Sequence, residues 1–225
     1  DDYAQSVTQF LETGAPMHDR LLNLLAGIEP IPVDVSQRAE LIGECQRCHA
    51  PTMIHKHPPF QRLFKMIGAT DESGVGNQRF RCSLVYLSDQ YFLDLLTWYH
   101  LAWLGQSLQH IPSVQRLMAQ GKEFTAQDRH ELLQVMRDCL AGLLPRYRQL
   151  AERGQVELSM TPYMHPIVPL LNDFQNMRCA LPDAPAPHAA DYPEGVERSR
   201  WHLQRGIEVF EDYFGRKPQG AWLSE

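Results

Sequence analysis

Two short apolar segments in the last third of the chain lead to acidic residues whose positions suit catalysis. Residues 156–160 contain Glu157, and residues 220–223 run almost directly into Glu225. Each segment follows a helical pattern that a glycine ends, so each is predicted to be a short strand. Catalytic groups collect at the carboxyl ends of strands in parallel α/β sheets. Glu225 is therefore a candidate catalytic carboxylate and Glu157 a candidate substrate-binding acid.

Other side chains near these segments have both a structural and a functional interpretation. Glu225 also fits an exposed terminal acid, and Glu157 also fits a surface residue of a strand. His165 and Tyr163 follow the first segment in a loop, a position that favours binding over a purely structural role; we do not expect His165 to bind a metal. Trp98 and Trp103 lie on a helical apolar stripe and are predicted to be core residues.

The elements around these segments predict an α/β protein that is predominantly helical. The first 70 residues read as short helices, and three longer helical patterns cover residues 88–105, 125–154 and 191–215. Ser88 is the expected N-cap of the first long helix, and Thr125 with Asp128 is a capping-box-like start of the second. Their order with the two strand segments is helix, strand, loop, helix, strand. That order is typical of a sheet with a few parallel strands.

Composition excludes several classes of function. The net charge of −6 gives no electrostatic basis for binding nucleic acid, and no apolar run approaches the length of a membrane span. Five scattered cysteines, an odd number, do not form a disulfide framework and indicate a reducing compartment. The acidic N-terminus lacks a signal-peptide pattern, so a cytoplasmic location is expected. The missing initiator Met predicts a natural start that was removed or lies upstream.

One motif points to a different chemistry. Cys45-Gln46-Arg47-Cys48-His49 has the C-x-x-C-H spacing of covalent haem attachment, and His55 and His57 follow closely enough to suggest a second axial ligand or a zinc site. Haem attachment of this kind requires export, and a zinc site requires two further ligands at suitable spacing. The competing interpretation is a pair of cysteines on a helix face beside a His-rich turn.

The chain resembles glycoside hydrolase family 57 in several stretches. Residues 154–171, with the letters GQVELSMTPYMHPIVPLL, are similar to the second signature region of the family. Residues 214–225, with Trp222-Leu223-Ser224-Glu225 at their end, are similar to the third region, which ends on the catalytic nucleophile. Residues 87–105 resemble a helical stretch of amylopullulanase-like members. The third region more usually has Pro at the position of Leu223.

This resemblance implies a fold and an activity. It implies a helical fragment of an incomplete (β/α)7 barrel, with a helical region at residues 1–83 and a segment leading into the catalytic barrel at residues 84–225. It implies a retaining enzyme acting on α-glucans, without a cofactor or a metal. Glu225 is then the nucleophile, and the substrate-binding residues are Glu157, Tyr163, His165 and Trp222, whose indole would form a wall for a sugar ring.

The same resemblance implies that some residues of the active site lie in other segments of a parent protein. The His-x-His-Gln-Pro signature is expected upstream of residue 1, and the general acid aspartate is expected beyond residue 225. The 225 residues alone are therefore expected to be inactive. Hydrolysis is favoured over glucan transfer, which stays open. A non-catalytic helical interaction or regulatory module, and a haem or metal protein, are the alternative functions.

Overall fold

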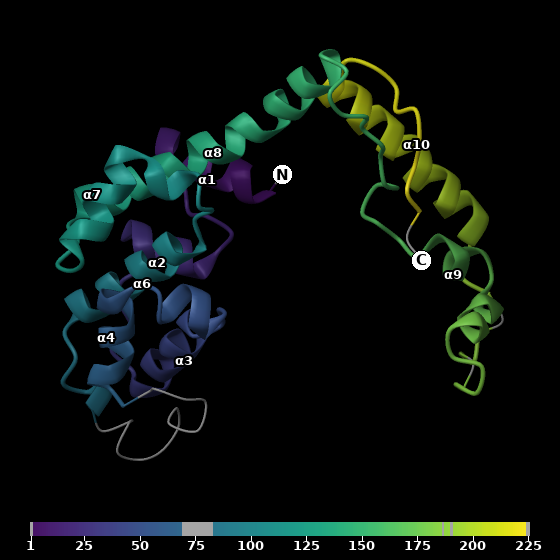
Figure 1. Cartoon of the computed structure of the whole chain (residues 1–225). Helices are drawn as coiled ribbons and strands as arrows, with labels where there is room; N and C mark the ends of the chain where they lie inside the picture. Colours follow the sequence, from purple (N-terminus) through teal and green to yellow (C-terminus); the bar gives the residue numbers. More distant parts are fainter. Residues whose placement is uncertain (1, 69–82, 186, 190, 224–225) are drawn as a thin grey trace. The chain divides into compact units, whose positions relative to one another are not determined.

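The computed structural model describes residues 2–68, 83–185, 187–189 and 191–223, and these residues are mostly helical (Figure 1). The chain divides into two compact units, Asp1–Leu140 and Ala141–Glu225. We describe each unit by itself. The prediction of a predominantly helical chain is confirmed.

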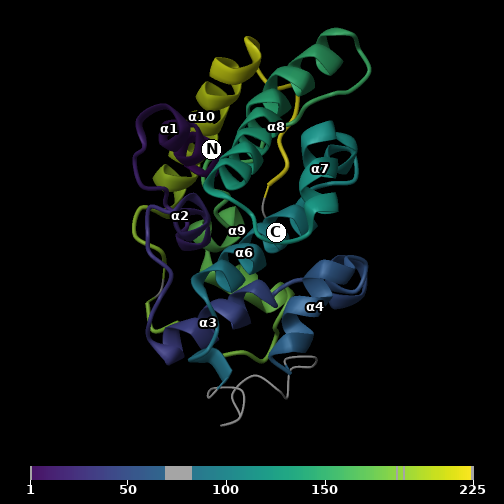
Figure 2. The same ribbon diagram turned by 90° about the vertical axis from the view of Figure 1, so that its left-hand side faces the viewer.

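The first unit is built around helix α6 (Asp89–Trp103). Helices α2 (Arg20–Ala26), α3 (Val35–Cys45) and α4 (Pro58–Met66) pack against α6, as does the π-helical turn η1 (Ala50–Ile54). Both views of the ribbon show α6 beside these helices (Figure 1, Figure 2). The unit also contains α1 (Asp2–Thr13), the 3-10 turn η2 (Leu108–His110), α7 (Pro112–Gln120) and the first part of α8 (Ala126–Glu152).

Local sequence signals explain where α6 begins and which face it buries. The Ser88 hydroxyl oxygen accepts a hydrogen bond from the Tyr91 amide at 3.3 Å, which confirms Ser88 as the N-cap. Phe92, Leu95 and Leu101 are fully buried. Buried residues lie around most of the circumference of α6, which is typical of a helix at the centre of a core.

The two tryptophans of α6 have different surroundings. Trp98 is 1% exposed, packs between Phe60 and Phe124, and donates from its indole nitrogen to the Gly121 carbonyl at 2.8 Å. The prediction of a core position is confirmed for Trp98. It is wrong for Trp103, which is 56% exposed. Trp103 follows Trp98 by five residues, which places its side chain roughly 140° away from that of Trp98 around the axis of the α-helix. Trp103 therefore lies off the buried face of α6.

Helix α8 begins where the sequence predicts. Thr125 and Asp128 bond reciprocally: the Thr125 amide donates to Asp128 Oδ2 at 2.9 Å, and the Asp128 amide donates to Thr125 Oγ1 at 3.2 Å. The helix contains Pro145, and Gly154 follows its end with a positive φ of 67°.

The second unit contains the last part of α8, α9 (Val168–Asn172), the 3-10 turn η3 (Phe174–Cys179) and α10 (Gly195–Phe214). Helix α9 packs against α10 and η3. Figure 1 shows the chain after α10 turning back along that helix. At Gly195 the α10 backbone lies against the Leu171 carbonyl so closely that a Cβ atom would collide with it.

The two segments predicted as strands do not become strands within the described residues. They pair at a single parallel bridge between Met160 and Ala221. Two short segments alone form few ladder hydrogen bonds, and such pairs are only marginally stable. The parallel direction agrees with the predicted α/β order, and the barrel itself stays a proposal.

Candidate functional site

The bridge between Met160 and Ala221 joins the two segments that carry the candidate residues. The Met160 amide donates to the Gly220 carbonyl at 3.1 Å, and the Trp222 amide donates to the Met160 carbonyl at 2.8 Å. Because the pairing is parallel, the residues after Met160 and the residues after Ala221 leave the bridge in the same direction. The loop with Tyr163 and the segment with Trp222 therefore begin side by side.

The loop after Met160 is fixed to helix α10. The Tyr163 amide donates to the His202 carbonyl at 2.9 Å, and His202 Nδ1 lies 2.7 Å from the Tyr163 carbonyl. Since a carbonyl only accepts, Nδ1 carries the proton that donates to it. This reciprocal pair of bonds holds Tyr163 against the middle of α10.

Two residues of this loop have an uncommon backbone conformation. Met164 has φ of 60° and His165 has φ of 51°, in the left-handed region that non-glycine residues seldom occupy. The His165 amide donates to the Pro162 carbonyl at 2.9 Å, which closes the turn. Strained loop residues of this kind concentrate at functional sites, and here the turn leaves His165 exposed.

Helix α10 adds side chains around Tyr163 that the sequence analysis missed. Trp201 meets the Tyr163 ring edge-to-face at 5.8 Å between centroids, and the Arg205 guanidinium lies 5.8 Å from the same ring centroid. Trp201 is 55% exposed. Trp201 and Arg205 are four residues apart on a helix and so share a face, which is the sequence signal that would have found them.

Gly206 explains how α10 comes so near the loop. A Cβ atom at Gly206 would lie 3.0 Å from the Thr161 carbonyl oxygen and 3.2 Å from the Tyr163 amide nitrogen. Gly206 is buried, so a side chain has no open direction to take. The absence of a side chain here lets the helix backbone touch the loop.

The structure brings some of the predicted site residues together and leaves others apart. The Trp222 amide bonds to Met160, three residues before Tyr163, so these two predicted residues lie on paired segments; the Trp222 side chain is 65% exposed. Glu157 is exposed, and no hydrogen bond or ion pair in the described part of the chain joins it to Tyr163, His165 or Trp222. Glu225 lies outside the described residues.

Comparison with known proteins identifies the family of this site. The sequence model described as glycosyl hydrolase family 57 matches residues 33–225, which include both bridged segments and most of the helices of the first unit. The chain belongs to glycosyl hydrolase family 57. No curated protein and no solved structure matches the chain significantly.

Membership of family 57 confirms the resemblance seen in the sequence and gives a coarse function. The chain is a glycoside hydrolase by family, and its substrate class is carbohydrate. No helix among the described residues is long and apolar enough to cross a membrane. The matched range begins at residue 33, so it covers residues 33–83 of the helical region as well as the bridged segments.

The C-x-x-C-H string of this family 57 chain lies in a packed environment. Cys45 is fully buried at the end of α3; this burial, with the nearby Glu44 and Cys48, raises the pKa of its thiol. Burial also raises the pKa of Cys48. Thiolates are the metal-binding form, and a raised pKa disfavours them.

The histidines near the string do not complete a metal site. His49 Nδ1 lies 2.8 Å from the Thr52 hydroxyl on the surface, whereas His57 is buried 5.5 Å from the Trp98 ring. Within the described ranges, no three His, Cys, Asp or Glu side chains are placed to hold a metal ion. The described residues therefore offer no ligand set for the zinc alternative.

Proposed function

We propose that this chain carries the nucleophile region of a retaining α-glucan hydrolase, with Glu225 as the nucleophile. The parallel bridge between Met160 and Ala221 is the main structural support. It directs the segment that leads to Glu225 to the same side as the loop of Tyr163 and His165. The family match over both segments supports the same assignment.

The proposed chemistry requires two carboxyl groups. In a retaining glycosidase the nucleophile lies about 5–5.5 Å from a carboxyl group that acts first as acid and then as base. The Glu225 carboxylate attacks the anomeric carbon, the glycosidic bond breaks, and the leaving oxygen takes a proton from the acid. Water then releases the sugar. A sugar hydroxyl in place of water gives glucan transfer, which is the alternative outcome of the same intermediate.

The remaining residues are assigned to substrate binding. The exposed indole of Trp222 offers a flat surface for a sugar ring. Tyr163 and His165 present a hydroxyl and an imidazole from the same loop, and Glu157 is assigned to a sugar hydroxyl. The mechanism needs no cofactor and no metal.

The two parts of the chain have different structural roles in this proposal. Residues 1–83 form a helical region, and residues 84–225 lead into an incomplete (β/α)7 barrel that other segments of the parent domain complete. The general acid is assigned to an aspartate of such a segment. We therefore expect the 225 residues alone to be inactive on α-glucans. We also propose that the protein is cytoplasmic.

A glucosyl fluoride tests the nucleophile without needing the general acid. Fluoride leaves without protonation, so the Glu225 carboxylate can displace it from the anomeric carbon of 5-fluoro-α-D-glucosyl fluoride and form a long-lived glycosyl ester. Peptide mass spectrometry should find the sugar on Glu225. The Glu225→Gln chain should remain unlabelled, whereas Glu211→Gln, a change at an exposed acid of α10, should not alter the labelling. Labelling that persists in Glu225→Gln, or none in the unaltered chain, contradicts the assignment.

A further inference from the structure

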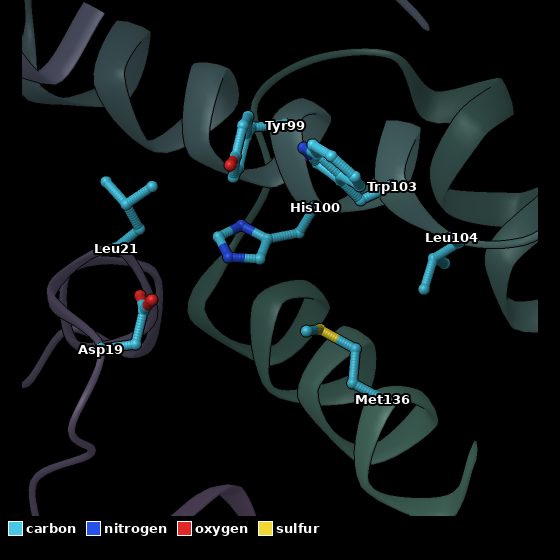
Figure 3. A pocket seen from close by; sticks show the side chains of 7 residues that line it. All are labelled: Asp19, Leu21, Tyr99, His100, Trp103, Leu104 and Met136. Carbon is cyan, nitrogen blue, oxygen red and sulfur yellow. The ribbon is translucent and has the colours of Figure 1, made fainter. Parts of the chain in front are cut away.

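The first unit contains a pocket of about 410 Å³ that the proposed catalytic chemistry does not use. Its walls come from the start of α2, the last turns of α6 and the middle of α8. Figure 3 shows Asp19 and Leu21 on one side, Tyr99, His100 and Trp103 of α6 on the other, and Met136 of α8 nearby. The volume lies within the range of small-molecule sites.

His100 provides a fixed hydrogen-bond acceptor in this pocket. The side chain is 94% buried (6% exposed), and Nδ1 lies 2.8 Å from the Leu96 carbonyl oxygen, so Nδ1 carries the proton. The other ring nitrogen, Nε2, is then an acceptor, and it has no hydrogen-bond partner in the described part of the chain. Burial lowers the pKa of His100 and so favours this neutral form. Figure 3 shows the ring directed toward Asp19 and Leu21.

Asp19 provides a second acceptor. Its Oδ1 accepts from the Leu22 amide at 2.9 Å as the N-cap of α2. No other side-chain hydrogen bond or ion pair engages the carboxylate within the described residues, so Oδ2 is available to a ligand. Neither Asp19 nor His100 offers a hydrogen-bond donor to a ligand. This pair of acceptors suits a ligand that is rich in hydroxyl groups, and it disfavours the binding of an anion.

Trp103 provides the aromatic surface at the same pocket. It is 56% exposed although the side chain is large and apolar, and Tyr99 meets it edge-to-face at 6.2 Å between centroids. Leu21, Leu104 and Met136 complete an apolar wall. An aromatic face beside hydroxyl acceptors matches a sugar ring, which presents apolar C–H groups on its faces and hydroxyls at its edge.

We propose that this pocket is a second carbohydrate-binding subsite, in which Trp103 stacks on a glucose unit of an α-glucan while Asp19 and His100 accept its hydroxyl hydrogens. The choice of an α-glucan rests on the proposed function. The pocket is lined by seven residues between Asp19 and Met136, and none of them belongs to the candidate site, whose residues lie after residue 156. It would hold a glucan chain without acting on it.

Indole N–H signals of the nitrogen-labelled 225-residue chain test the subsite. The chain contains four tryptophans, and the Trp103 signal is identified by its loss in Trp103→Phe. Titration with maltotriose should move the Trp103 signal, and Trp103→Ala should weaken maltotriose binding about fivefold or more, since a stacked aromatic contact is lost. Tyr86→Ala, a change at an aromatic side chain that is 89% exposed and does not line the pocket, should leave the affinity unchanged.

A second variant separates binding from folding. Asp19→Asn keeps one side-chain oxygen that can accept from the Leu22 amide, so the N-cap of α2 is retained. The second carboxylate oxygen, which faces the ligand in our proposal, is replaced by an NH2 group that donates and does not accept. Binding should fall about threefold or more, which is the scale of one lost hydrogen bond. Unchanged affinity in both Asp19→Asn and Trp103→Ala overturns the subsite.

The remaining outcomes separate the subsite from the proposed nucleophile. Maltotriose that moves only the signals of Trp201 or Trp222, or moves none, overturns the subsite and leaves the Glu225 assignment to the fluoride experiment. A moving Trp103 signal combined with no label on Glu225 supports the subsite and rejects the nucleophile. A Trp103 signal that responds to tetramethylammonium but not to maltotriose shows a site for cations and also overturns the subsite.

Discussion

At the scale of single residues, two carboxylates hold the turn between α7 and α8. Asp94 on α6 accepts from the backbone amides of Glu123 and Phe124 at 2.8 and 3.0 Å, and from Gln90 at 2.8 Å. Asp94 is 5% exposed, so these bonds are shielded from water. The turn leads into α8, and through Phe124 it also contacts Trp98 at the centre of the core.

Replacing Asp94 by alanine should therefore destabilise the first unit strongly. The buried Phe124 amide and the partly buried Glu123 amide would lose their acceptor, and we expect a loss of about 3 kcal/mol in the free energy of unfolding. Urea unfolding followed by the indole N–H signal of Trp98 measures the change, because the fluorescence of the four tryptophans overlaps. Asp138→Ala removes an exposed acid from α8 and should change the stability by about 0.5 kcal/mol or less. Equal effects of the two changes would argue against a structural role for Asp94.

Asp128 gives the stability of the first unit a dependence on pH. Desolvation acts to raise the pKa of Asp128, but hydrogen bonds from Thr125, Gln120 and Arg116 outweigh it and hold the pKa well below its usual range. The ionised carboxylate is thus stabilised by folding. This contribution is complete above the unfolded pKa of about 4, and it is lost as the pH falls from there toward the lower folded value.

Asp128→Asn tests this dependence. At pH 7 the variant should be less stable by about 1–2 kcal/mol, because the N-terminus of α8 loses a charged acceptor. The difference from the unaltered chain should shrink as the pH drops below about 4, because Asp128 binds a proton in the unfolded chain at that pH and in the folded chain only at a lower pH. Denaturant unfolding at several pH values measures it. A difference that is constant with pH would show that ionisation of Asp128 does not contribute.

At the scale of elements, local signals were sufficient for helices but not for strands. The N-cap at Ser88 and the reciprocal bonds of Thr125 with Asp128 depend on neighbouring residues, and the sequence predicted both. The segments 156–160 and 220–223 have the apolar pattern of strands, yet a strand is completed by bonds to neighbours that the segments themselves do not supply. Among the residues that the structure describes, the Met160–Ala221 bridge is the only pairing of these two segments.

The candidate site was predicted to a similar extent. The sequence placed Tyr163 in a loop after the first apolar run and Trp222 within the second, and the bridge joins these two runs; the binding roles of both residues stay predictions. It missed Trp201, His202 and Arg205, which reach Tyr163 through the packing of α10 on the loop. Such contacts depend on the close approach at Gly206, and a helical glycine alone does not reveal what lies beside it.

Gly206→Ala should loosen the loop from α10. The new Cβ would meet the Thr161 carbonyl, Met160 and the Tyr163 amide within 3.0–3.2 Å, and we expect a cost of about 1–3 kcal/mol even though alanine favours helices. Faster hydrogen exchange at the Tyr163 amide, which bonds to the His202 carbonyl, would show that the loop has loosened from α10. Gly142→Ala in α8 is the matched control: its Cβ meets nothing within 4 Å, so it should stabilise by about 0.5–1 kcal/mol. Unchanged exchange in Gly206→Ala would contradict a close contact.

At the scale of the whole molecule, apolar burial is uneven between the two units. Among the described residues, the buried hydrophobic side chains of the second unit are Ala151, Met160, Val168 and Phe210, and all the others belong to the first unit. The second unit leaves Trp201, Trp222 and other large apolar side chains exposed. Composition, which is averaged over 225 residues, did not reveal this asymmetry.

The second unit should consequently open more easily than the first. Local opening costs little where few apolar contacts are lost, and proteases cut such regions first. Arg47 in the first unit and Arg178 in the second are both exposed trypsin sites outside α-helices. Arg178 lies in the 3-10 turn η3 and Arg47 in an irregular segment, so local structure alone would favour cleavage at Arg47. Limited digestion of the chain, followed by mass spectrometry, should show cleavage after Arg178 well before cleavage after Arg47. Cleavage at Arg47 at an equal or higher rate would mean that the core of the first unit does not protect the segment after α3, and that burial is a poor guide to the stability of this molecule.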